Sequence, residues 1–244
     1  MTKTAVILAG GAGTRLRPYT TVLPKPLMPV GEYPILEVII RQLAQAGVRR
    51  VTLAVNHQAE IIRSYFNGGA KWGIEICYSL EQKPLGTMGP LKLMEKSLPE
   101  NFYVLNGDVL TDLDFRALHD RHINDDALFT IGAYRRTVRS EYGVLKVDGT
   151  DNLIGFEEKP INEYLVSMGV YMVSRRVLDY IPPDTGFGFD DLMLELLAAG
   201  KKVETFRHDG LWLDIGRPDD YMQAIDLFEE EEARLLPKQL RLVS

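Results

Sequence analysis

The stretch KTAVILAGGAG at residues 3–13 sets the class of fold, because an uninterrupted apolar run passes directly into a glycine-rich loop. Such a run is typical of a strand that is buried on both faces of a parallel sheet. The glycines let the backbone approach a ligand closely. Residues 14–30, TRLRPYTTVLPKPLMPV, add two arginines, one lysine and four prolines. Arginine and lysine are the usual partners of phosphate, so this strand end is predicted to bind a polyphosphate.

Strand-like runs alternate with helical periodicity along the chain. Strands are predicted over 3–9, 50–55, 74–80, 102–105 and 128–134, and helices over 35–46, 58–66, 87–98 and 115–123. This order predicts an α/β fold, Rossmann-like, with a mixed, mostly parallel sheet and helices on both faces. Ligands should then lie at the carboxyl ends of strands.

The pattern changes after residue 141. The segment YGVLKVDGTDNLIGFEEKP predicts a hairpin that turns at Asp148-Gly149. A strand over 166–173, a helix over 190–199, a strand over 202–207 and a last helix from about Pro218 follow. Because no linker, repeat or low-complexity tract interrupts the chain, we expect one domain over residues 1–244.

Composition narrows the classes of partner and location. The 244 residues carry a net charge of −6, whereas nucleic-acid binders usually present a basic field. The single cysteine, Cys77, excludes a disulfide framework, and no apolar run reaches transmembrane length. We therefore expect a cytoplasmic protein with neither a nucleic acid nor a membrane as partner.

The glycine loop fails two familiar phosphate-binding patterns. A G-x-G-x-x-G pattern starting at Gly11 would meet Leu16 at its third glycine, and Gly13-Thr14-Arg15 lacks the Gly-Lys-Ser/Thr of a P-loop. Taken alone, the glycines fit a tight turn with surface arginines as well as a phosphate cradle.

Longer motifs are more specific. The segment GGAGTRLRPYTTVLPKPLMPV at 10–30 resembles the signature of the sugar-phosphate nucleotidylyltransferases, also called NDP-sugar pyrophosphorylases. Further similar segments are PLGTMGPL at 84–91, LNGDVL at 105–110, YGVL at 142–145, FEEKP at 156–160, SMGVY at 167–171 and LWLDIG at 211–216. The loop at 84–91 is most similar to the mannose-1-phosphate guanylyltransferase branch.

The resemblance implies an enzyme that joins an NTP and a sugar 1-phosphate into an NDP-sugar and releases pyrophosphate. It implies Arg15 and Lys25 as catalytic residues and Asp108 and Asp214 as ligands of Mg²⁺. It also implies a nucleotide-binding half over about 1–140 and a sugar-phosphate-binding half over about 141–236. The implied nucleotide-binding residues are Leu8, Ala9, Gly10, Gly11, Gly13, Thr14, Glu81, Pro84, Gly86 and Thr87. The implied sugar-phosphate-binding residues are Asn106, Gly107, Tyr142, Gly143, Glu158, Lys159, Ser167 and Gly169.

The base is less determined than the reaction. A carboxylate at Glu81 only accepts hydrogen bonds, which suits the N–H groups of guanine, but Gln82 at the next position would reverse the argument. We expect GTP with mannose 1-phosphate or a related sugar. The alternatives are a uridylyl- or thymidylyltransferase acting on glucose 1-phosphate, and, from another class, a non-catalytic regulatory subunit that binds an NDP-sugar. A homo-oligomer is compatible with the catalytic and with the regulatory alternatives.

Several polar residues are expected to have structural roles. Asp112 and Asp114 are predicted to cap the helix at 115–123, and Asp219 and Asp220 to occupy the first turn of the last helix. His119 and His122 are predicted to lie on an exposed helix face, because no third ligand for a metal is near them in sequence.

Overall fold

The computed structural model describes residues 2–56 and 58–236, so the last eight residues of the expected domain lie outside it. A seven-stranded sheet has the strand order β12-β8-β11-β6-β1-β4-β5. Neighbouring strands of this sheet run parallel, except that β11 runs antiparallel to both β6 and β8. The predicted mixed, mostly parallel α/β sheet is confirmed.

The strands and helices have the following bounds. The sheet contains β1 (Lys3–Leu8), β4 (Val48–Val55), β5 (Glu75–Leu80), β6 (Asn101–Asn106), β8 (Phe129–Arg139), β11 (Ile161–Ser174) and β12 (Val203–His208). Short pairs are β2 (Pro29–Val30) with β3 (Tyr33–Pro34), β7 (Val109–Thr111) with β13 (Trp212–Asp214), and β9 (Val144–Val147) with β10 (Leu153–Glu157). The α-helices are α1 (Ile35–Gln45), α2 (Ala59–Phe66), α3 (Gly89–Leu93), α4 (Phe115–Asn124), α5 (Phe189–Ala198) and α6 (Pro218–Leu235). Short 3-10 helices occur at Thr14–Leu16, Tyr19–Thr21, Lys25–Leu27, Ala70–Trp72 and Arg175–Tyr180.

Two hydrophobic cores lie on opposite faces of the sheet. In β1, Ala5 and Ile7 belong to the core that also contains apolar residues of α1, α2, α4 and α6. Val6 between them belongs to the other core, with residues of α3 and α5. Alternate side chains of a strand point to opposite faces, so a strand covered on both sides must be apolar at every position. This explains the uninterrupted apolar run from which the fold class was predicted.

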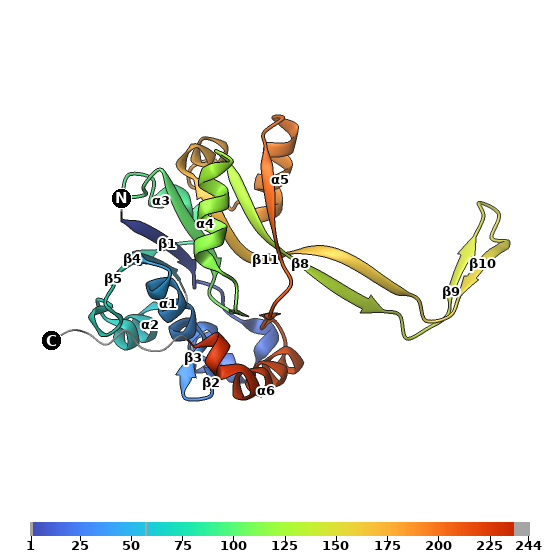
Figure 1. Ribbon diagram of the computed structural model, residues 1–244, viewed down its shortest axis with the longest axis horizontal. Coiled ribbons are helices and arrows are strands. Elements are labelled where there is room, and N and C mark those ends of the chain that lie inside the picture. The colour runs from blue at the N-terminus through green and yellow to red at the C-terminus, as the bar shows by residue number, and fades with distance from the viewer. Residues whose placement is uncertain (1, 57, 237–244) are drawn as a thin grey trace.

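The strands β8 and β11 continue well beyond the predicted 128–134 and 166–173. They pair from Val166↔Tyr134 out to Ile161↔Arg139, and the predicted hairpin forms as β9 and β10 at their far end. Figure 1 shows this ribbon projecting from the body of the molecule, with β9 and β10 at its tip. We call residues 135–166 the arm.

Other sequence-based predictions need correction. The helix predicted over 87–98 is limited to α3, because the Met88 and Gly89 amides donate to the carbonyl oxygen of Phe187 and Pro90 marks the first helical turn. His122 is not exposed: it is buried, and its ring contacts Thr130 and Asn101. Within the described part of the chain, His, Cys, Asp and Glu side chains form no group of three or more suited to a metal ion, so a metal site there would have at most two such ligands.

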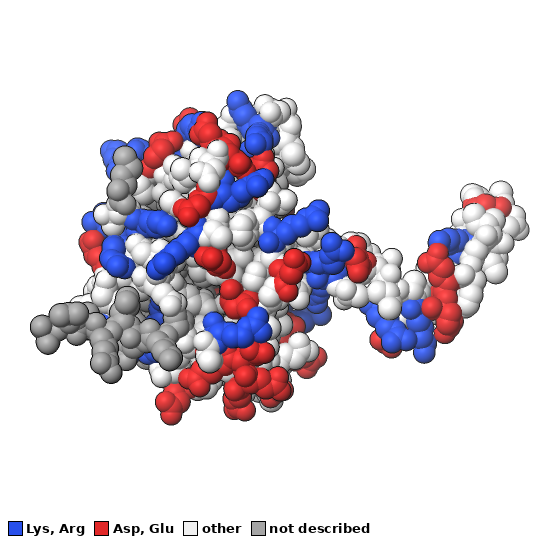
Figure 2. Space-filling view, in the orientation of Figure 1, with Lys and Arg blue, Asp and Glu red and all other residues white. Residues whose placement is uncertain are grey.

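The first turns of two helices agree with the sequence-based prediction. Asp114 caps α4 by accepting hydrogen bonds from the Arg116 and Ala117 amides, at 2.9 and 3.0 Å. Asp220 accepts from the amides of Gly216 and Arg217 at the start of α6. The acidic run later in α6 forms a charged surface at the lower edge of the body (Figure 2).

Candidate active site

Two hollows lie at the carboxyl ends of β1 and β6, and a third adjoins them beside β8 and β13. The base hollow, of about 610 Å³, is lined by Leu8, Gly10, Gly11, Ala12, Asn56, Glu81, Pro84, Leu85, Gly86, Thr87, Asn106 and Asp108. The phosphate hollow is lined by Leu8, Ala9, Gly11, Gly13, Thr14, Arg15, Lys25, Pro26, Gly107, Asp108 and Gly216. The third hollow is lined by Arg15, Tyr134, Arg136, Trp212, Leu213, Asp214, Gly216, Arg217, Asp220 and Gln223. Shared lining residues make the three hollows one cleft.

The glycine loop is shaped to expose Arg15 and Lys25 to the cleft. Gly13 has φ +59°, a left-handed conformation that glycine adopts without strain. A Cβ at this position would lie 2.9 Å from the Thr20 side chain and 3.2 Å from Lys25 Cβ, and Thr20 Oγ1 donates to the Gly13 carbonyl at 2.7 Å. The loop is therefore folded tightly over the segment that carries Lys25.

Pairing of β7 with β13 brings the two predicted metal aspartates together. Asp108 directly precedes β7 and Asp214 ends β13, and Val109 pairs with Asp214 in the antiparallel register. The Ile215 amide donates to the Asp108 carbonyl at 3.1 Å, which extends this pairing past both carboxylates. Two aspartates 106 positions apart in sequence thus lie on paired segments beside the cleft.

Opposite charges surround the two aspartates. Lys25 Nζ forms an ion pair with Asp108 Oδ2, with both side chains largely buried. Burial raises the pKa of the Asp214 carboxyl, the negative charge of Asp108 raises it further, and the positive charges of Lys25 and Arg15 oppose this rise. The charges of Arg15, Lys25 and Asp108 therefore all act on the Asp214 carboxyl.

The donor set fits a divalent metal ion. Asp108 Oδ1 is buried and has no hydrogen-bond partner among the described residues, which is costly for a carboxylate oxygen unless a ligand satisfies it. Two carboxylates with few other protein ligands suit a hard cation that completes its shell with phosphate oxygens and water. A cation beside the two carboxylates would also offset the burial and the Asp108 charge that raise the pKa of Asp214.

Glu81 and Gln82 differ in their positions relative to the base hollow. Glu81 is 8% exposed and lines the hollow, whereas Gln82 is exposed and is not among the lining residues. Glu81 Oε2 accepts from the Leu85 amide at 3.3 Å, and Oε1 faces Gly10, where a Cβ would lie only 3.0 Å away. Burial raises the pKa of the Glu81 carboxyl. Met88 belongs to the hydrophobic core and does not line this hollow.

The predicted sugar-phosphate residues divide into two groups. Asn106 and Gly107 line the cleft, and Gly169 packs against Asn106. Ser167 is hydrogen-bonded to Tyr171, whose pKa is raised to about 12, mainly by burial and also by the charges of Asp214 and Asp108. The second group, Tyr142, Gly143, Glu158 and Lys159, directly flanks β9 and β10, at the junction between this hairpin and the β8–β11 ribbon. Within one chain, the fold does not bring this group to Arg15 or Asp108.

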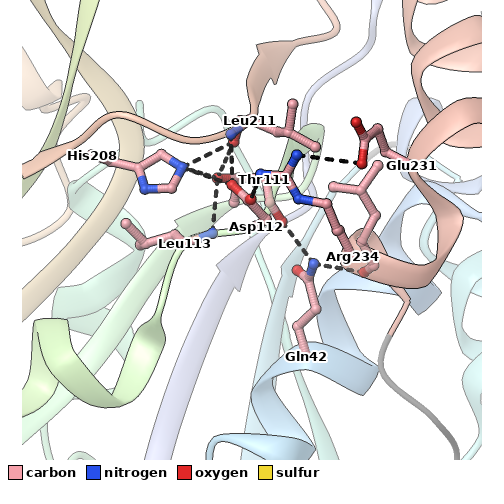
Figure 3. A network of polar contacts seen from close by, with 9 residues as sticks. Gln42, Thr111, Asp112, Leu113, His208, Leu211, Glu231 and Arg234 are labelled. Carbon is pink, nitrogen blue, oxygen red and sulfur yellow. Dashed lines mark hydrogen bonds and ion pairs between the residues drawn. The ribbon is translucent and has the colours of Figure 1, made fainter.

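A polar network surrounds Asp112, which directly follows β7 (Figure 3). The Leu211 amide donates to Asp112 Oδ1 at 2.6 Å, and Thr111 Oγ1 donates to the Leu211 carbonyl at 2.7 Å. Asp112 also pairs with His208, at 3.0 Å, and with Arg234 of α6. Asp112 is therefore not a helix cap, contrary to the prediction, because its carboxylate faces the loop that leads into β13.

The charge state of Asp112 follows from these contacts. Burial acts to raise its pKa, but the hydrogen bond from Leu211 and the pairs with Arg234 and His208 outweigh burial, so the net pKa is lowered. Because Asp112 stays ionised, it fixes the strand that ends at Asp214 to the strand that follows Asp108.

Sequence reasoning missed several residues of the cleft. Asn56 follows β4, and Tyr134, Arg136 and Trp212 line the third hollow. The position of Asn56 after a predicted strand was a usable signal, since ligands gather at such ends. Tyr134 and Arg136 carried no local signal, because only the pairing of β8 within the sheet directs them to the cleft.

Comparisons with known proteins agree with this geometry. A model of the nucleotidyl transferase family matches residues 4–231. A mannose-1-phosphate guanyltransferase of Debaryomyces hansenii is 38% identical over 96% of this chain and 67% of its own length. A UTP–glucose-1-phosphate uridylyltransferase of Synechocystis is 36% identical over 91% of this chain and 62% of its own length. A crystal structure of HddC from Yersinia pseudotuberculosis complexed with GMP-PN has TM-score 0.70 and 27% identity, covering 93% of this chain and 100% of the other.

The chain belongs to the nucleotidyl transferase family, as its motifs predicted. Within the residues that the structure describes, no helix combines the length and apolar character needed to cross a membrane.

Proposed function

We propose that this chain is a guanylyltransferase that joins GTP with mannose 1-phosphate, or a related sugar 1-phosphate, to give a GDP-sugar and pyrophosphate. The coarser reaction, nucleotidyl transfer to a sugar 1-phosphate, is that of its family and named relatives. The observation that carries the proposal is the gathering of Arg15, Lys25, Asp108 and Asp214 beside a hollow in which Glu81 is buried.

In the proposed reaction, a phosphate oxygen of the sugar 1-phosphate attacks the α-phosphorus of the NTP. A new P–O bond forms, the bond to the β-phosphate oxygen breaks, and pyrophosphate leaves with its electron pair. The attacking phosphate has its second pKa near ~6 and is largely ionised at neutral pH, so no general base is needed. Catalysis then requires positioning of two anions and stabilisation of the charge at the reacting phosphorus.

Two cationic side chains that follow β1, Arg15 and Lys25, meet these requirements. Arg15 lines both the phosphate hollow and the third hollow, where it can bind the triphosphate and the departing pyrophosphate. Lys25 lies between Pro24 and Pro26, whose fixed φ angles reduce the entropy lost in holding it. When the triphosphate binds, the Lys25 ammonium is placed to contact the sugar phosphate or the α-phosphate.

Asp108 and Asp214 would hold Mg²⁺, the cation that prefers oxygen ligands and retains phosphate oxygens. When bound, this ion neutralises charge on the phosphates and orients them.

Recognition of guanine rests on Glu81. Guanine presents N1–H and N2–H₂ donors to an acceptor-only carboxylate, whereas uracil and thymine present carbonyl oxygens that a carboxylate repels. The buried position of Glu81 in the lining of the base hollow supports this choice. The similarity to a guanyltransferase and to a structure complexed with GMP-PN gives independent support.

The direct test is pyrophosphate release from the protein with Mg²⁺, each of five NTPs and a panel of sugar 1-phosphates. We expect release with GTP and mannose 1-phosphate or a close relative. Release with no pair would refute the enzyme, and release with UTP or dTTP in place of GTP would refute the role of Glu81.

Two matched pairs of variants test the assigned residues. Arg15→Ala should lower turnover by about 10²–10³-fold, the usual effect of losing a transition-state charge partner, while the exposed neighbour Arg17→Ala leaves it within twofold. Glu81→Gln should reduce the preference for GTP over UTP, while Gln82→Ala leaves it unchanged. An Arg15→Ala enzyme with a normal rate, or an unaltered preference in Glu81→Gln, contradicts the corresponding role.

The non-catalytic regulatory alternative is disfavoured, since a degenerate subunit would be expected to lack one of the four charged groups that this cleft retains. A cytoplasmic location, expected from the single cysteine, stays a prediction that fractionation can test.

A further inference from the structure

The arm is a two-stranded ribbon with both edges open. Strand β12 pairs with β8 only as far as Tyr134, and β6 pairs with β11 only from Val170 onward. Beyond these points, β8 and β11 pair with no other strand among residues 2–56 and 58–236. An open edge presents unpaired N–H and C=O groups, which is a template for pairing with another chain.

The tip of the arm, formed by β9 and β10, carries an apolar face. Leu145 pairs with Phe156 and Val147 with Leu153, and these side chains are 62%, 57%, 51% and 61% exposed. More than half of the exposed large hydrophobic residues in the described part of the chain lie between positions 138 and 165. An isolated two-stranded hairpin is marginal in water, so this face is expected to be covered.

The proposed reaction needs residues that the arm carries out of reach. Lys159 lies eight residues before Ser167, which at a strand rise of ~3.3 Å places it about 26 Å along the ribbon. The ladder is paired without interruption from Val166 to Ile161, and the Ser140 amide continues it to the Pro160 carbonyl at 2.9 Å. Folding Lys159 back onto its own cleft would break this ladder.

The root of the arm lies at the mouth of the cleft. Tyr134 and Arg136 line the third hollow together with Arg15 and Asp214. If two such arms lie antiparallel, the outer part of each arm, which carries Lys159, reaches the root of the other arm and therefore the cleft beside it. A two-fold axis makes the contact reciprocal and closed.

We propose that two copies of this chain exchange arms, so that Lys159 and Glu158 of one copy complete the sugar-phosphate side of its partner's cleft. The apolar tip face packs against the partner, and the open edges of the two ribbons face each other. This inference rests on the proposed function for the roles of Lys159 and Glu158, and on the structure alone for the contact between copies.

Complementation tests the exchange. Lys159→Ala and Arg15→Ala should each be strongly impaired alone. A heterodimer of the two, purified through two different affinity tags after co-expression, has one cleft with a native Arg15 and a native partner arm. It should recover about half of the wild-type rate, because one of two symmetric sites is intact. A heterodimer whose rate does not exceed the summed rates of the two variant homodimers would show that the arm acts within its own chain. This result would overturn the proposal.

A matched control and a second readout separate the possible failures. A heterodimer of Arg15→Ala with Lys25→Ala, both defective in the cleft, should recover no activity. Recovery of activity there would discredit the complementation signal and overturn the proposal.

The mass in solution is a second readout. By light scattering, the native protein should have twice the 27.5 kDa mass of the chain. The double variant Leu145→Asp and Phe156→Asp should have the single mass, and the exposed Leu194→Asp in α5 should keep the double mass. A monomeric native protein, or a tip variant that stays dimeric, overturns the exchange while pyrophosphate release remains to test the function. A dimer that the tip variant dissociates, but that shows no release with any substrate pair, overturns the function and supports the contact between copies.

Discussion

The buried His122 should make the stability of this protein depend on pH between 7 and 4. The side chain is on the buried face of α4 at 1% exposure, with Nδ1 2.8 Å from Thr130 Oγ1 and Nε2 3.1 Å from Asn101 Oδ1. Burial lowers the pKa of His122 to about 4 from 6.5, and the positive charges of His119 and Arg176 contribute. The folded protein therefore holds this imidazole neutral.

The direction and size of this pH dependence follow from the difference in proton binding between the folded and unfolded chains. Between pH 6.5 and pH 4 the unfolded chain binds a proton at this histidine more readily than the folded chain does. Its contribution to stability is present above pH 6.5 and is lost as the pH falls toward 4. With these two pKa values, the free energy of unfolding should fall by about 2 kcal/mol from pH 7 to pH 5 and by about 3 kcal/mol to pH 4.

Urea unfolding of the native protein and of His122→Gln at pH 7, 6, 5 and 4 measures this term. The glutamine amide can still contact Asn101 but does not titrate, so the difference in free energy of unfolding between the two proteins should shrink by about 2 kcal/mol from pH 7 to pH 5. Carboxylates titrate in both proteins and cancel in the difference. Parallel stability profiles over this range would refute the assignment of a buried neutral histidine.

Three further changes test how the site is held. Gly169→Ala should lower the free energy of unfolding by more than ~1 kcal/mol, because φ is +72° and a Cβ would lie 2.5 Å from Asn106 Nδ2; Gly149→Ala, with open space around it, should be neutral in the same thermal melts. Asp114→Ala should cost about 1 kcal/mol in urea unfolding through loss of the α4 cap, and an unchanged midpoint would contradict that role. Asp112→Ala should cost about 2 kcal/mol and also reduce pyrophosphate release, since it frees the strand that ends at Asp214; a loss of stability with normal turnover would limit Asp112 to a structural role.

Most of the fold was predictable because its signals are local. A strand covered on both faces must be apolar throughout, and such runs alternating with amphipathic helices specify a mostly parallel sheet. Gly11 and Asp108 closely follow predicted strands and could be assigned to the carboxyl edge of that sheet, whereas Arg15 and Lys25 were assigned through the resemblance of their motif.

Tertiary structure alone decided the remaining features, since each depends on contacts between distant segments. Pairing of β7 with β13 brings Asp214 next to the segment that carries Asp108. Asp112, predicted to cap a helix, instead accepts a hydrogen bond from the Leu211 amide in the loop before β13. Packing of α4 against the sheet buries His122, which was predicted from the sequence to lie on an exposed helix face. Sequence motifs named Lys159 for the sugar side of the cleft, but the long β8–β11 ladder determined that its own chain holds it away from that cleft.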